Sequence, residues 1–380
     1  MKIEGTLLNT ITLILLSAGN ATRFHSEIKK QWIRIGDIPL WLHVARTFEK
    51  ARDFDEIIIV SSAQELAHME HFAPYTYSEG GKDRQASLQN ALQKVTTSHV
   101  LVSDVARACV PSEMIVRICD AKTEAGCIVP TLDIVDTLYH NATPIEREAC
   151  QIIQTPQLSK TDLLRRALET ETRFSDESSA IASLGEKVHF VQGSDKAHKL
   201  TSLADLQRLS CLKAPASRTL VGFGIDTHPF EKGKKMFLCG LPIESDEGFK
   251  AHSDGDVAIH ALIDALLGAA GMGDIGELFP DTDATYAGVD SNLLLEETVN
   301  RINSFGYTII NVDLTIVAES PKISPYKMQM RSHLSKHLNV EQNFVNIKAT
   351  TAEKLGFIGR KEGVTVHAVA NLTYTDWTQI

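Results

Sequence analysis

Hydrophobic residues in the first half of the chain fall into short blocks that alternate between two spacings. Nearly continuous apolar runs predict buried strands, and apolar residues three or four apart predict helices. We expect strands at Ile11–Ser17, Glu56–Ser61 and His99–Ser103, and helices at Pro39–Arg52 and Asp83–Val95. This alternation predicts a doubly wound, Rossmann-like α/β domain whose mostly parallel sheet has helices on both faces. Ligands of such sheets bind beyond the carboxyl ends of the strands, so chemistry is expected in the loops that follow Ser17 and Ser103.

The second half of the chain has a different pattern, in which strands and helices alternate less regularly. Strand-like runs occupy Thr219–Ile225, Thr308–Ala318, Asn343–Thr351 and Thr365–Tyr374, and helical spacing occupies Asp254–Gly271, Asp290–Phe305 and Pro325–Leu338. This half is predicted to be a separate α+β domain. A short stretch of small and polar residues at 211–218 interrupts both patterns, so we expect domains at 1–210 and 219–380 joined by this linker.

Composition narrows the functional classes. The 380-residue chain has a formal net charge of -10 and a pI of about 5.8, which argues against a nucleic-acid partner. Its longest apolar stretches are shorter than the ~20 residues that a membrane helix needs, and its start lacks a signal-peptide pattern. A cytoplasmic protein without a membrane partner is therefore expected. The six cysteines form no CxxC pair, so free thiols are expected rather than a disulfide framework.

Candidate metal ligands occur at the start of the second half. Asp226 and His228 are two residues apart on a predicted strand, so their side chains share one face. His260, in the following helix, is a third candidate, and three protein ligands leave the fourth position of Zn²⁺ open for substrate. The alternative is that Asp226 caps a turn and both histidines are ordinary core or surface groups. Ser253–Asp256 is also open to two interpretations, a helix N-cap or a phosphate site at a helix N-terminus.

Ordered blocks extend this pattern at Gly224–His228, His252–His260, Asp264–Gly268, Gly273–Gly276, Leu278–Asp281, Pro321–Lys322 and Ala349–Arg360. With them, residues 219–380 resemble methylerythritol cyclodiphosphate synthases over their whole length. The resemblance implies a homotrimer with active sites between subunits and Zn²⁺ on Asp226, His228 and His260. It implies catalytic roles for His252 and Glu353, the latter holding a second divalent ion, Mg²⁺ or Mn²⁺. The implied substrate-binding residues are Ser253, Asp274, Gly276, Phe279, Asp281, Lys322, Thr350, Thr351, Phe357 and Arg360.

The implied reaction joins two anionic groups of one substrate. The 2-phosphate of CDP-methylerythritol 2-phosphate attacks its own β-phosphorus, which gives the cyclic diphosphate and releases CMP. Cations that reduce repulsion and align the two ends would therefore supply the catalysis. No nucleophilic side chain is required, which agrees with the lack of any activated serine or cysteine motif.

Two loops of the first half have glycine and basic residues that suit phosphate. Ser17–Phe24 follows the first predicted strand and precedes Lys29–Gln31, and Gly80–Ser87 leads into a predicted helix. Asp104 ends the third strand, where it would hold Mg²⁺ or cap the next turn. Taken singly, each loop also fits an ordinary solvated loop.

Further blocks at Ala106–Arg107, Asp136–Thr137, Arg147, Thr155–Gln157, Ser175–Glu177 and Lys199 complete the pattern. In this order, they make residues 8–208 resemble methylerythritol phosphate cytidylyltransferases. The resemblance implies that Arg23, Lys30 and Lys199 stabilise the transition state in which methylerythritol phosphate attacks the α-phosphorus of CTP and pyrophosphate leaves. It implies Mg²⁺ or Mn²⁺ on Asp104. The implied substrate-binding residues are Gly19, Gly81, Arg84, Ser87, Thr137 and Arg147, the last two acting across a dimer interface.

The first half also departs from that family. Ala21 stands where a glycine is expected, Lys29 where a proline is expected, and Lys82 where an acid is expected. These changes bear on the rigidity of the loop that carries Lys30 and on base selection more than on reaction type.

Together the two halves predict a bifunctional enzyme of isoprenoid biosynthesis. Its two steps are not consecutive, because a separate kinase must act between them, and that kinase is a candidate partner. Trimeric contacts of one half and dimeric contacts of the other predict a hexamer. Two alternatives stay open: an active synthase fused to a different sugar-phosphate nucleotidyltransferase, or one fused to a degenerate scaffold domain.

Overall fold

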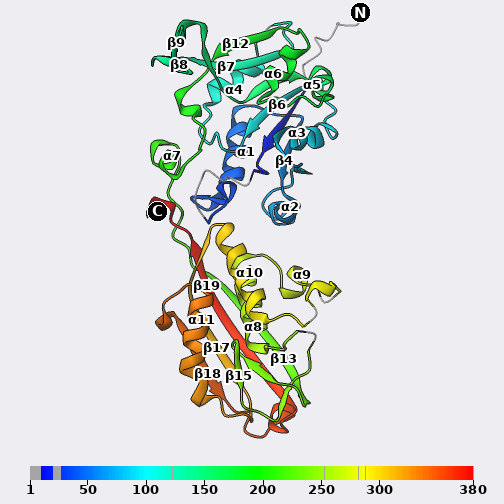
Figure 1. Cartoon of the computed structure of the whole chain (residues 1–380), viewed down its shortest axis with the longest axis vertical. Coiled ribbons are helices and arrows are strands. Elements are labelled where there is room, and N and C mark those ends of the chain that lie inside the picture. Colours follow the sequence, from blue (N-terminus) through cyan, green and yellow to red (C-terminus); the bar gives the residue numbers. More distant parts are fainter. Residues whose placement is uncertain are drawn as a thin grey trace, which may run out of the picture. The chain divides into compact units, whose positions relative to one another are not determined.

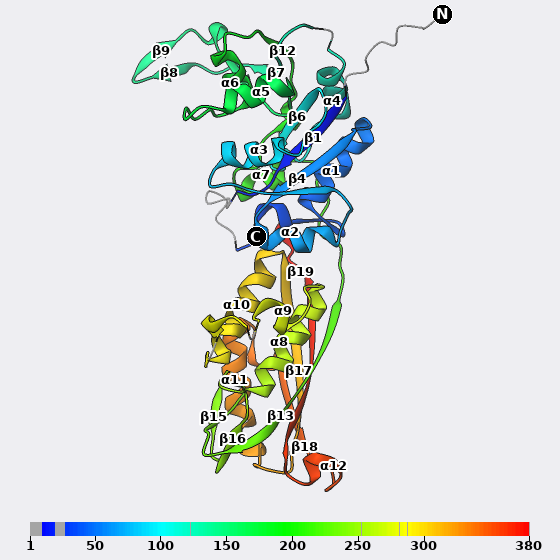
Figure 2. The same cartoon turned by 90° about the vertical axis from the view of Figure 1, so that its right-hand side faces the viewer.

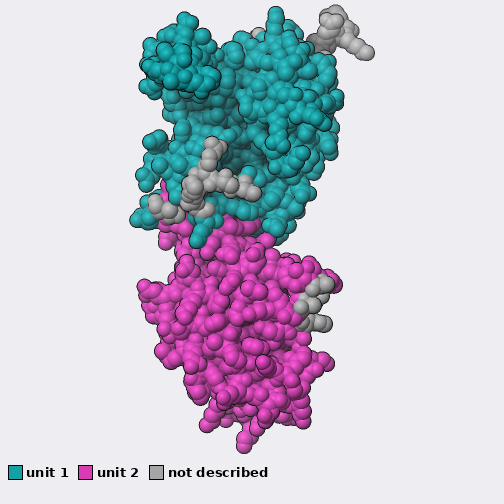
Figure 3. Space-filling model, in the orientation of Figure 1, with its two compact units in different colours: residues 1–214, 378–380 teal, residues 215–377 magenta. Residues whose placement is uncertain are grey.

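The computed structural model describes residues 10–19, 27–121, 123–251, 253–280, 282–286 and 288–379 (Figures 1 and 2). Two compact units divide the chain, one of residues 1–214 with 378–380 and one of residues 215–377 (Figure 3). Across the described ranges, every helix is too short or too polar to cross a bilayer.

The first unit contains a mixed sheet with the strand order β10-β7-β11-β6-β1-β4-β5, and β12 also pairs with β7. Its strands are β1 (Ile11–Leu16), β4 (Glu56–Ser61), β5 (Thr76–Glu79), β6 (His99–Asp104), β7 (Cys127–Asp133), β10 (Gln151–Ile153), β11 (Gln157–Lys160) and β12 (Val188–Gln192). β1 is parallel to β4 and β6, whereas β11 is antiparallel to β6 and β7. The sheet is therefore parallel around β1, as predicted, and β11 adds an antiparallel strand between β6 and β7.

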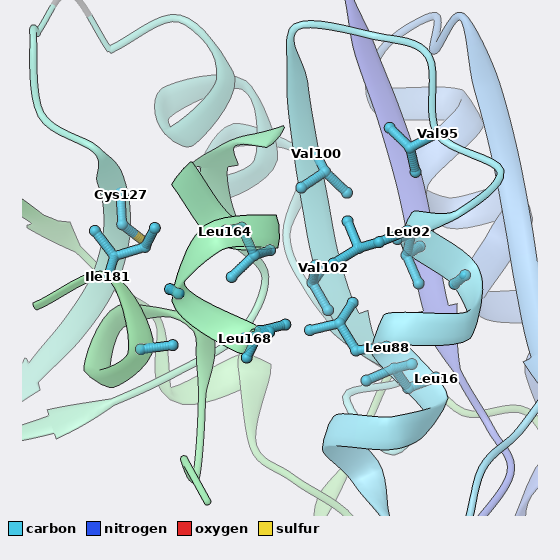
Figure 4. Packing of buried hydrophobic residues seen from close by; sticks show 14 of the residues in the cluster. Leu16, Leu88, Leu92, Val95, Val100, Val102, Cys127, Leu164, Leu168 and Ile181 are labelled. Atoms are coloured by element: carbon cyan, nitrogen blue, oxygen red, sulfur yellow. The ribbon is translucent and has the colours of Figure 1, made fainter. Parts of the chain in front are cut away.

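Helices cover both faces of this sheet. α3 (Arg84–Leu92), α5 (Thr161–Leu168) and α6 (Glu177–Ser183) lie on one face, and α1 (Leu40–Ala51) and α4 (Ser112–Cys119) pack together on the other (Figure 2). Figure 4 shows the core beneath the first three, where Leu88 and Leu164 meet Val102 of β6. The helices predicted at Pro39–Arg52 and Asp83–Val95 correspond to α1 and α3. α2 (Ala63–Glu70) follows β4, and α7 (Leu203–Arg208) comes late in the unit.

A hairpin of β8 (Leu138–His140) and β9 (Thr143–Ile145) extends from the first unit (Figures 1 and 2). Its turn residues Asn141 and Ala142 have φ angles of 48° and 62°, as the two-residue turns favoured in hairpins require. All three residues of β9 are exposed. The hairpin is therefore an arm whose sides do not pack on the unit's own core.

Cys109 and Cys211 form a disulfide, so the prediction that the cysteines are free thiols is wrong for this pair. The two residues are 102 positions apart, and no sequence motif marks a pair that only the fold brings together. Cys119, Cys127, Cys150 and Cys239 are free.

The second unit is a sheet with helices on one face. The strand order is β16-β13-β19-β17-β18, formed by β13 (Leu220–Lys232), β16 (Glu247–Phe249), β17 (Tyr307–Val317), β18 (Val345–Thr350) and β19 (Gly363–Tyr374). α8 (Val257–Ala270), α10 (Ser291–Ser304) and α11 (Lys327–His337) pack against one face (Figures 1 and 2). On the other face Val221, Phe223 and Ile225 of β13 are 64%, 59% and 51% exposed. This sheet therefore leaves an apolar strip uncovered within the chain.

Two glycines of β13 bring the strand into contact with α8. A Cβ on Gly222 or Gly224 would overlap backbone atoms of α8, so only glycine permits this approach. Because side chains alternate along a strand, Asp226 and His228 continue the face on which the glycines lie. The close approach therefore places His260, in the first turn of α8, over Asp226 and His228.

Candidate active sites

A pocket of about 470 Å³ opens at the carboxyl ends of β1 and β6. This is the edge of the sheet where the sequence predicts chemistry. Seven residues with predicted roles line it: Gly19, Lys30, Gly81, Arg84, Ser87, Asp104 and Lys199. The structure therefore gathers residues from five separate sequence segments into one cavity.

Asp104 lies in an ion-pair network within this pocket. Its Oδ2 is 2.6 Å from Nζ of Lys199, and its Oδ1 is 3.3 Å from Nε of Arg84. Burial alone would raise the pKa of Asp104, but Arg84 and Lys199 outweigh burial and lower it. Nη1 of Arg84 also lies 2.7 Å from the fully buried carboxylate of Glu177. An ionised carboxylate at the pocket wall suits Mg²⁺, which prefers oxygen ligands.

The glycine loop before α3 is held by local hydrogen bonds. The backbone N–H of Gly81 donates to Oγ of Ser87 at 3.0 Å. Asp83 caps α3 by accepting from the backbone N–H of Ala86 at 2.9 Å. A Cβ on Gly81 would overlap Ala86, so the loop needs glycine at this position. These contacts present the loop backbone to the pocket in one conformation.

Lys30 reaches the pocket from a short 3₁₀ turn, η2 (Lys30–Trp32). Its Nζ donates to the carbonyl oxygen of Leu200 at 2.5 Å. Lys199, the neighbour of Leu200, is the residue that pairs with Asp104. The two lysines therefore approach the same end of the cavity from distant parts of the sequence.

Two other predicted residues of this half, Thr137 and Arg147, are not among the described lining residues. Arg23 lies outside the described residues. Thr137 precedes β8, and Arg147 lies in the 3₁₀ turn after β9. Nε of Arg147 is 2.9 Å from Oε1 of Glu148, and nearly half of the Arg147 side chain is exposed. Thr137 and Arg147 therefore flank the hairpin arm in the sequence.

Three predicted metal ligands meet in a second pocket, of about 360 Å³. The ligand atoms of Asp226, His228 and His260 lie within 4.8 Å of one another. Nε2 of His228 is 3.0 Å from Oδ2 of Asp226, and Nδ1 of His260 is 3.3 Å from the same oxygen. β13 supplies two of these side chains and α8 the third.

Hydrogen bonds on the outer sides of the two imidazoles determine which nitrogens face Asp226. Nδ1 of His228 is 3.0 Å from a backbone carbonyl of the loop before α8, which can only accept, so Nδ1 carries the proton. Oγ of Ser291 donates to Oδ1 of Asp254 at 2.5 Å, so it accepts from Nε2 of His260 at 3.1 Å. In the neutral rings, both inward nitrogens therefore present lone pairs to Asp226.

This arrangement fits a metal ion. Oδ2 of Asp226 is buried and accepts no hydrogen bond from the described part of the chain. Burial alone would raise the pKa of Asp226 and lower that of His228, but contact between them outweighs burial and shifts each pKa the other way. The point between the three side chains therefore favours a cation. Two imidazoles and one carboxylate are a ligand set that suits Zn²⁺.

The remaining predicted residues of this half divide into two groups. Ser253, Gly276 and Phe279 line the second pocket, while Asp274 caps α9 (Ile275–Leu278) by accepting from the backbone N–H of Glu277 at 2.9 Å. His252 and Asp281 lie outside the described residues. Six others are absent from the described lining of this pocket: Lys322, Thr350, Thr351, Glu353, Phe357 and Arg360.

Some residues that contact the sites carry no role in the sequence interpretation. Ser291 follows the N-cap residue Asp290, so the sequence alone indicates an ordinary helix start at this position. In the structure its Oγ also contacts Nε2 of His260. Asp264 lines the second pocket one turn beyond His260, and this spacing of four residues along α8 was the available signal. Glu65 contacts the turn that carries Lys30 from a helix 34 residues away, and no local motif indicates that contact.

Comparisons with known proteins match both halves. The family model described as 2-C-methyl-D-erythritol 4-phosphate cytidylyltransferase (IspD) matches residues 11–212, and that of the YgbB family matches residues 219–373. A bifunctional enzyme IspD/IspF of Sulfurovum sp. (strain NBC37-1) is 63% identical over 97% of this chain and 99% of its own. One from Sulfurimonas denitrificans is 53% identical over 100% and 98%. The structure of the bifunctional IspDF from Campylobacter jejuni superposes with a TM-score of 0.89 at 42% identity, covering 97% of this chain and 100% of that one.

Proposed function

We propose, since this chain belongs to the family of bifunctional IspD/IspF enzymes, that its two pockets are the active sites of two separate reactions. Residues 11–212 are a cytidylyltransferase domain and residues 219–373 a cyclodiphosphate synthase domain of isoprenoid biosynthesis. The match over both halves disfavours a different nucleotidyltransferase or a degenerate scaffold.

In the first pocket, the phosphate of 2-C-methyl-D-erythritol 4-phosphate attacks the α-phosphorus of CTP, and pyrophosphate leaves. Lys30 and Lys199 stand at the end of the cavity where the triphosphate charge would gather, and they stabilise the transition state electrostatically. Asp104 would hold Mg²⁺, which supplies further charge neutralisation when bound. Gly81 and Ser87 present the loop that receives the cytosine. The observation that carries this assignment is the convergence of Lys30, Lys199 and Asp104 on one cavity.

In the second pocket, the 2-phosphate of CDP-methylerythritol 2-phosphate attacks the β-phosphorus, and CMP leaves. Asp226, His228 and His260 would hold Zn²⁺, which supplies a positive charge for the attacking phosphate when bound. Ser253, which lines the pocket, offers its hydroxyl as a hydrogen-bond donor to phosphate oxygens. Phe279 and Gly276 shape the part of the pocket that takes the methylerythritol unit. The observation that carries this assignment is the inward orientation of the three ligand atoms.

Neighbouring copies of the chain would complete both sites. Glu353, Thr350 and Thr351 lie beyond the pocket of their own chain, which suits residues that act on the diphosphate of an adjacent subunit. The uncovered strip of Val221, Phe223 and Ile225 supports association through that sheet face, since apolar surface of this kind marks interfaces. The exposed hairpin arm, with Thr137 and Arg147 near it, would reach a second copy of the first domain. A hexamer satisfies both contacts, and a native mass measurement tests it.

Two assays on one preparation test the assignment. With CTP, methylerythritol phosphate and Mg²⁺, the protein is expected to release pyrophosphate. With CDP-methylerythritol 2-phosphate and divalent ions, it is expected to release CMP. Lys30→Ala is expected to abolish the first activity and spare the second, and His260→Ala to do the reverse. If the unsubstituted protein releases neither pyrophosphate nor CMP, the proposed function is refuted. If either variant loses both activities, the two sites are not independent.

A further inference from the structure

The turn that carries Lys30 has an unusual start. Lys29 occupies the position before it with a φ of -65°, an angle that a proline would fix but that a lysine leaves unrestricted. A lysine that stabilises a transition state must nevertheless be held in place, because misplacement by about 1 Å can cost about 100-fold in rate. Some other contact of this chain has to restrain the turn.

Glu65 provides such a contact from α2. Its Oε1 accepts from Nε2 of Gln31 at 2.8 Å and from Nε1 of Trp32 at 2.7 Å, and Nζ of Lys29 lies 3.5 Å from the same oxygen. Three of the four residues from Lys29 to Trp32 therefore direct their side chains to one carboxylate. Lys30, the fourth, extends to the pocket instead.

The other carboxylate oxygen ties Glu65 to the end of β4. Oε2 accepts from Oγ of Ser61 at 2.8 Å and from Oγ of Ser62 at 2.7 Å. Glu65 itself is only 2% exposed. Burial would raise its pKa, but Lys29 and the hydroxyl and indole donors outweigh burial and lower it. The side chain is thus a buried, ionised and well-satisfied anchor between the sheet and the turn.

We propose that Glu65 is a positioning residue for cytidylyl transfer, acting by holding the turn from Lys29 to Trp32 so that Lys30 enters the pocket at one place. This inference rests on the proposed function of the first domain. The ion pair with Lys29 adds a restraint that the backbone of a lysine does not supply by itself. Glu65 does not line the pocket, so its effect passes through the turn and not through contact with substrate.

The test is Glu65→Gln in the full-length protein, a change that keeps the shape but removes the charge and one acceptor. The kcat for pyrophosphate release is expected to fall about 10- to 100-fold, while the KM for CTP changes by less than about threefold, because a displaced Lys30 weakens the transition state more than the ground state. Asp55→Asn is the matched control, since Asp55 accepts from the backbone N–H of Ile11 at 2.7 Å, at the opposite end of β1. Its kcat is expected to stay within about twofold of the parent.

The outcomes separate the inference from the function on which it rests. CMP release by the second domain, measured on the same sample, standardises the amount of active protein, and an unchanged KM for CTP verifies that the first domain is folded. A Glu65→Gln protein whose kcat stays within twofold, or whose KM rises while kcat holds, overturns the inference. An unsubstituted protein that releases no pyrophosphate overturns the proposed function instead. If Glu65→Gln does not fold, Ser62→Ala removes one donor from the helix side, and an unchanged kcat in that variant also overturns the inference.

Discussion

Replacing Ser291 by alanine is expected to weaken metal binding in the second pocket without touching a metal ligand. Oγ of Ser291 is buried, lies 3.1 Å from Nε2 of His260, and donates to Asp254. In this position it holds the outer proton of the ring, so that the inner nitrogen keeps its lone pair. Alanine leaves the backbone N–H of Ser291 in place, which still donates to Oδ2 of Asp254 at 3.1 Å. The substitution therefore removes the two hydrogen bonds of Oγ, with His260 and Asp254, and keeps the backbone contact at the helix start.

The expected loss of Zn²⁺ affinity depends on which hydrogen-bond partners His260 keeps in Ser291→Ala. Loss of a partner behind a metal ligand typically costs 10- to 100-fold in affinity. Oγ of Ser253 is also within reach of Nε2 of His260, at 3.2 Å, and would partly replace the lost acceptor. We therefore expect the lower end of that range, about tenfold, which corresponds to about 1.4 kcal/mol.

Competition between the protein and a coloured chelator for Zn²⁺ at pH 7.5 measures this directly. Ser304→Ala is the matched control, because Ser304 lies on the same helix and its Oγ donates to the carbonyl oxygen of Arg301 at 2.8 Å. The control is expected to bind Zn²⁺ like the parent. A Ser291→Ala protein with affinity within twofold of the parent would refute the argument about the ring proton, even if its turnover were impaired.

Three further predictions concern stability. Gly224→Ala is expected to lower the free energy of unfolding of the second unit by on the order of 3 kcal/mol, because the new Cβ would overlap α8. Gly268 has open space around it, so Gly268→Ala is expected to leave that free energy unchanged. Chemical denaturation measures both. Glu177→Gln is expected to destabilise the first unit by about 2 kcal/mol, since it removes the charge of a fully buried carboxylate that pairs with the partly buried Arg84. Glu186→Gln breaks an exposed pair of 3.7 Å and is expected to cost less than about 0.5 kcal/mol. Burial lowers the pKa of His43 from 6.5, so the unfolded state takes up the proton at higher pH than the folded state. The stability of the first unit is therefore expected to fall as pH drops below 6.5. Thermal unfolding of His43→Gln at several pH values is expected to show a weaker fall.

Sequence patterns sufficed where the chemistry is local or periodic. Asp226 and His228 share a strand face and His260 lies in the following helix, so spacing made the three side chains candidates, and the family resemblance singled them out as one site, which the structure brings together. Strands and helices with long apolar patterns, such as β1 and α8, were also located to within a few residues. β11 was not anticipated, because a four-residue strand carries too little periodicity to reveal its direction.

Contacts between distant segments could not be predicted. Ser291 meets His260 across 31 residues, and Glu177 meets Arg84 across 93. Ser291 and Glu177 each stand at a predicted or observed helix start, and that position alone accounts for a polar residue there. Their second role depends on how two elements pack, which a single sequence does not encode in any short pattern. The supporting residues are therefore the part of each site that only the fold reveals.

The two pockets differ in the charges of their lining side chains, and therefore in what a bound metal ion would contribute to each. In the first, the described lining has four cationic side chains against two carboxylates; in the second it has one lysine, two carboxylates and two imidazoles. Both substrates bring several negative charges. The lysines and arginine of the first pocket already form a positive field, to which a bound Mg²⁺ adds. In the second, Asp226 and Asp264 would repel a diphosphate unless a cation lay between the imidazoles. A divalent ion held by Asp226, His228 and His260 would therefore favour substrate binding as well as the chemical step.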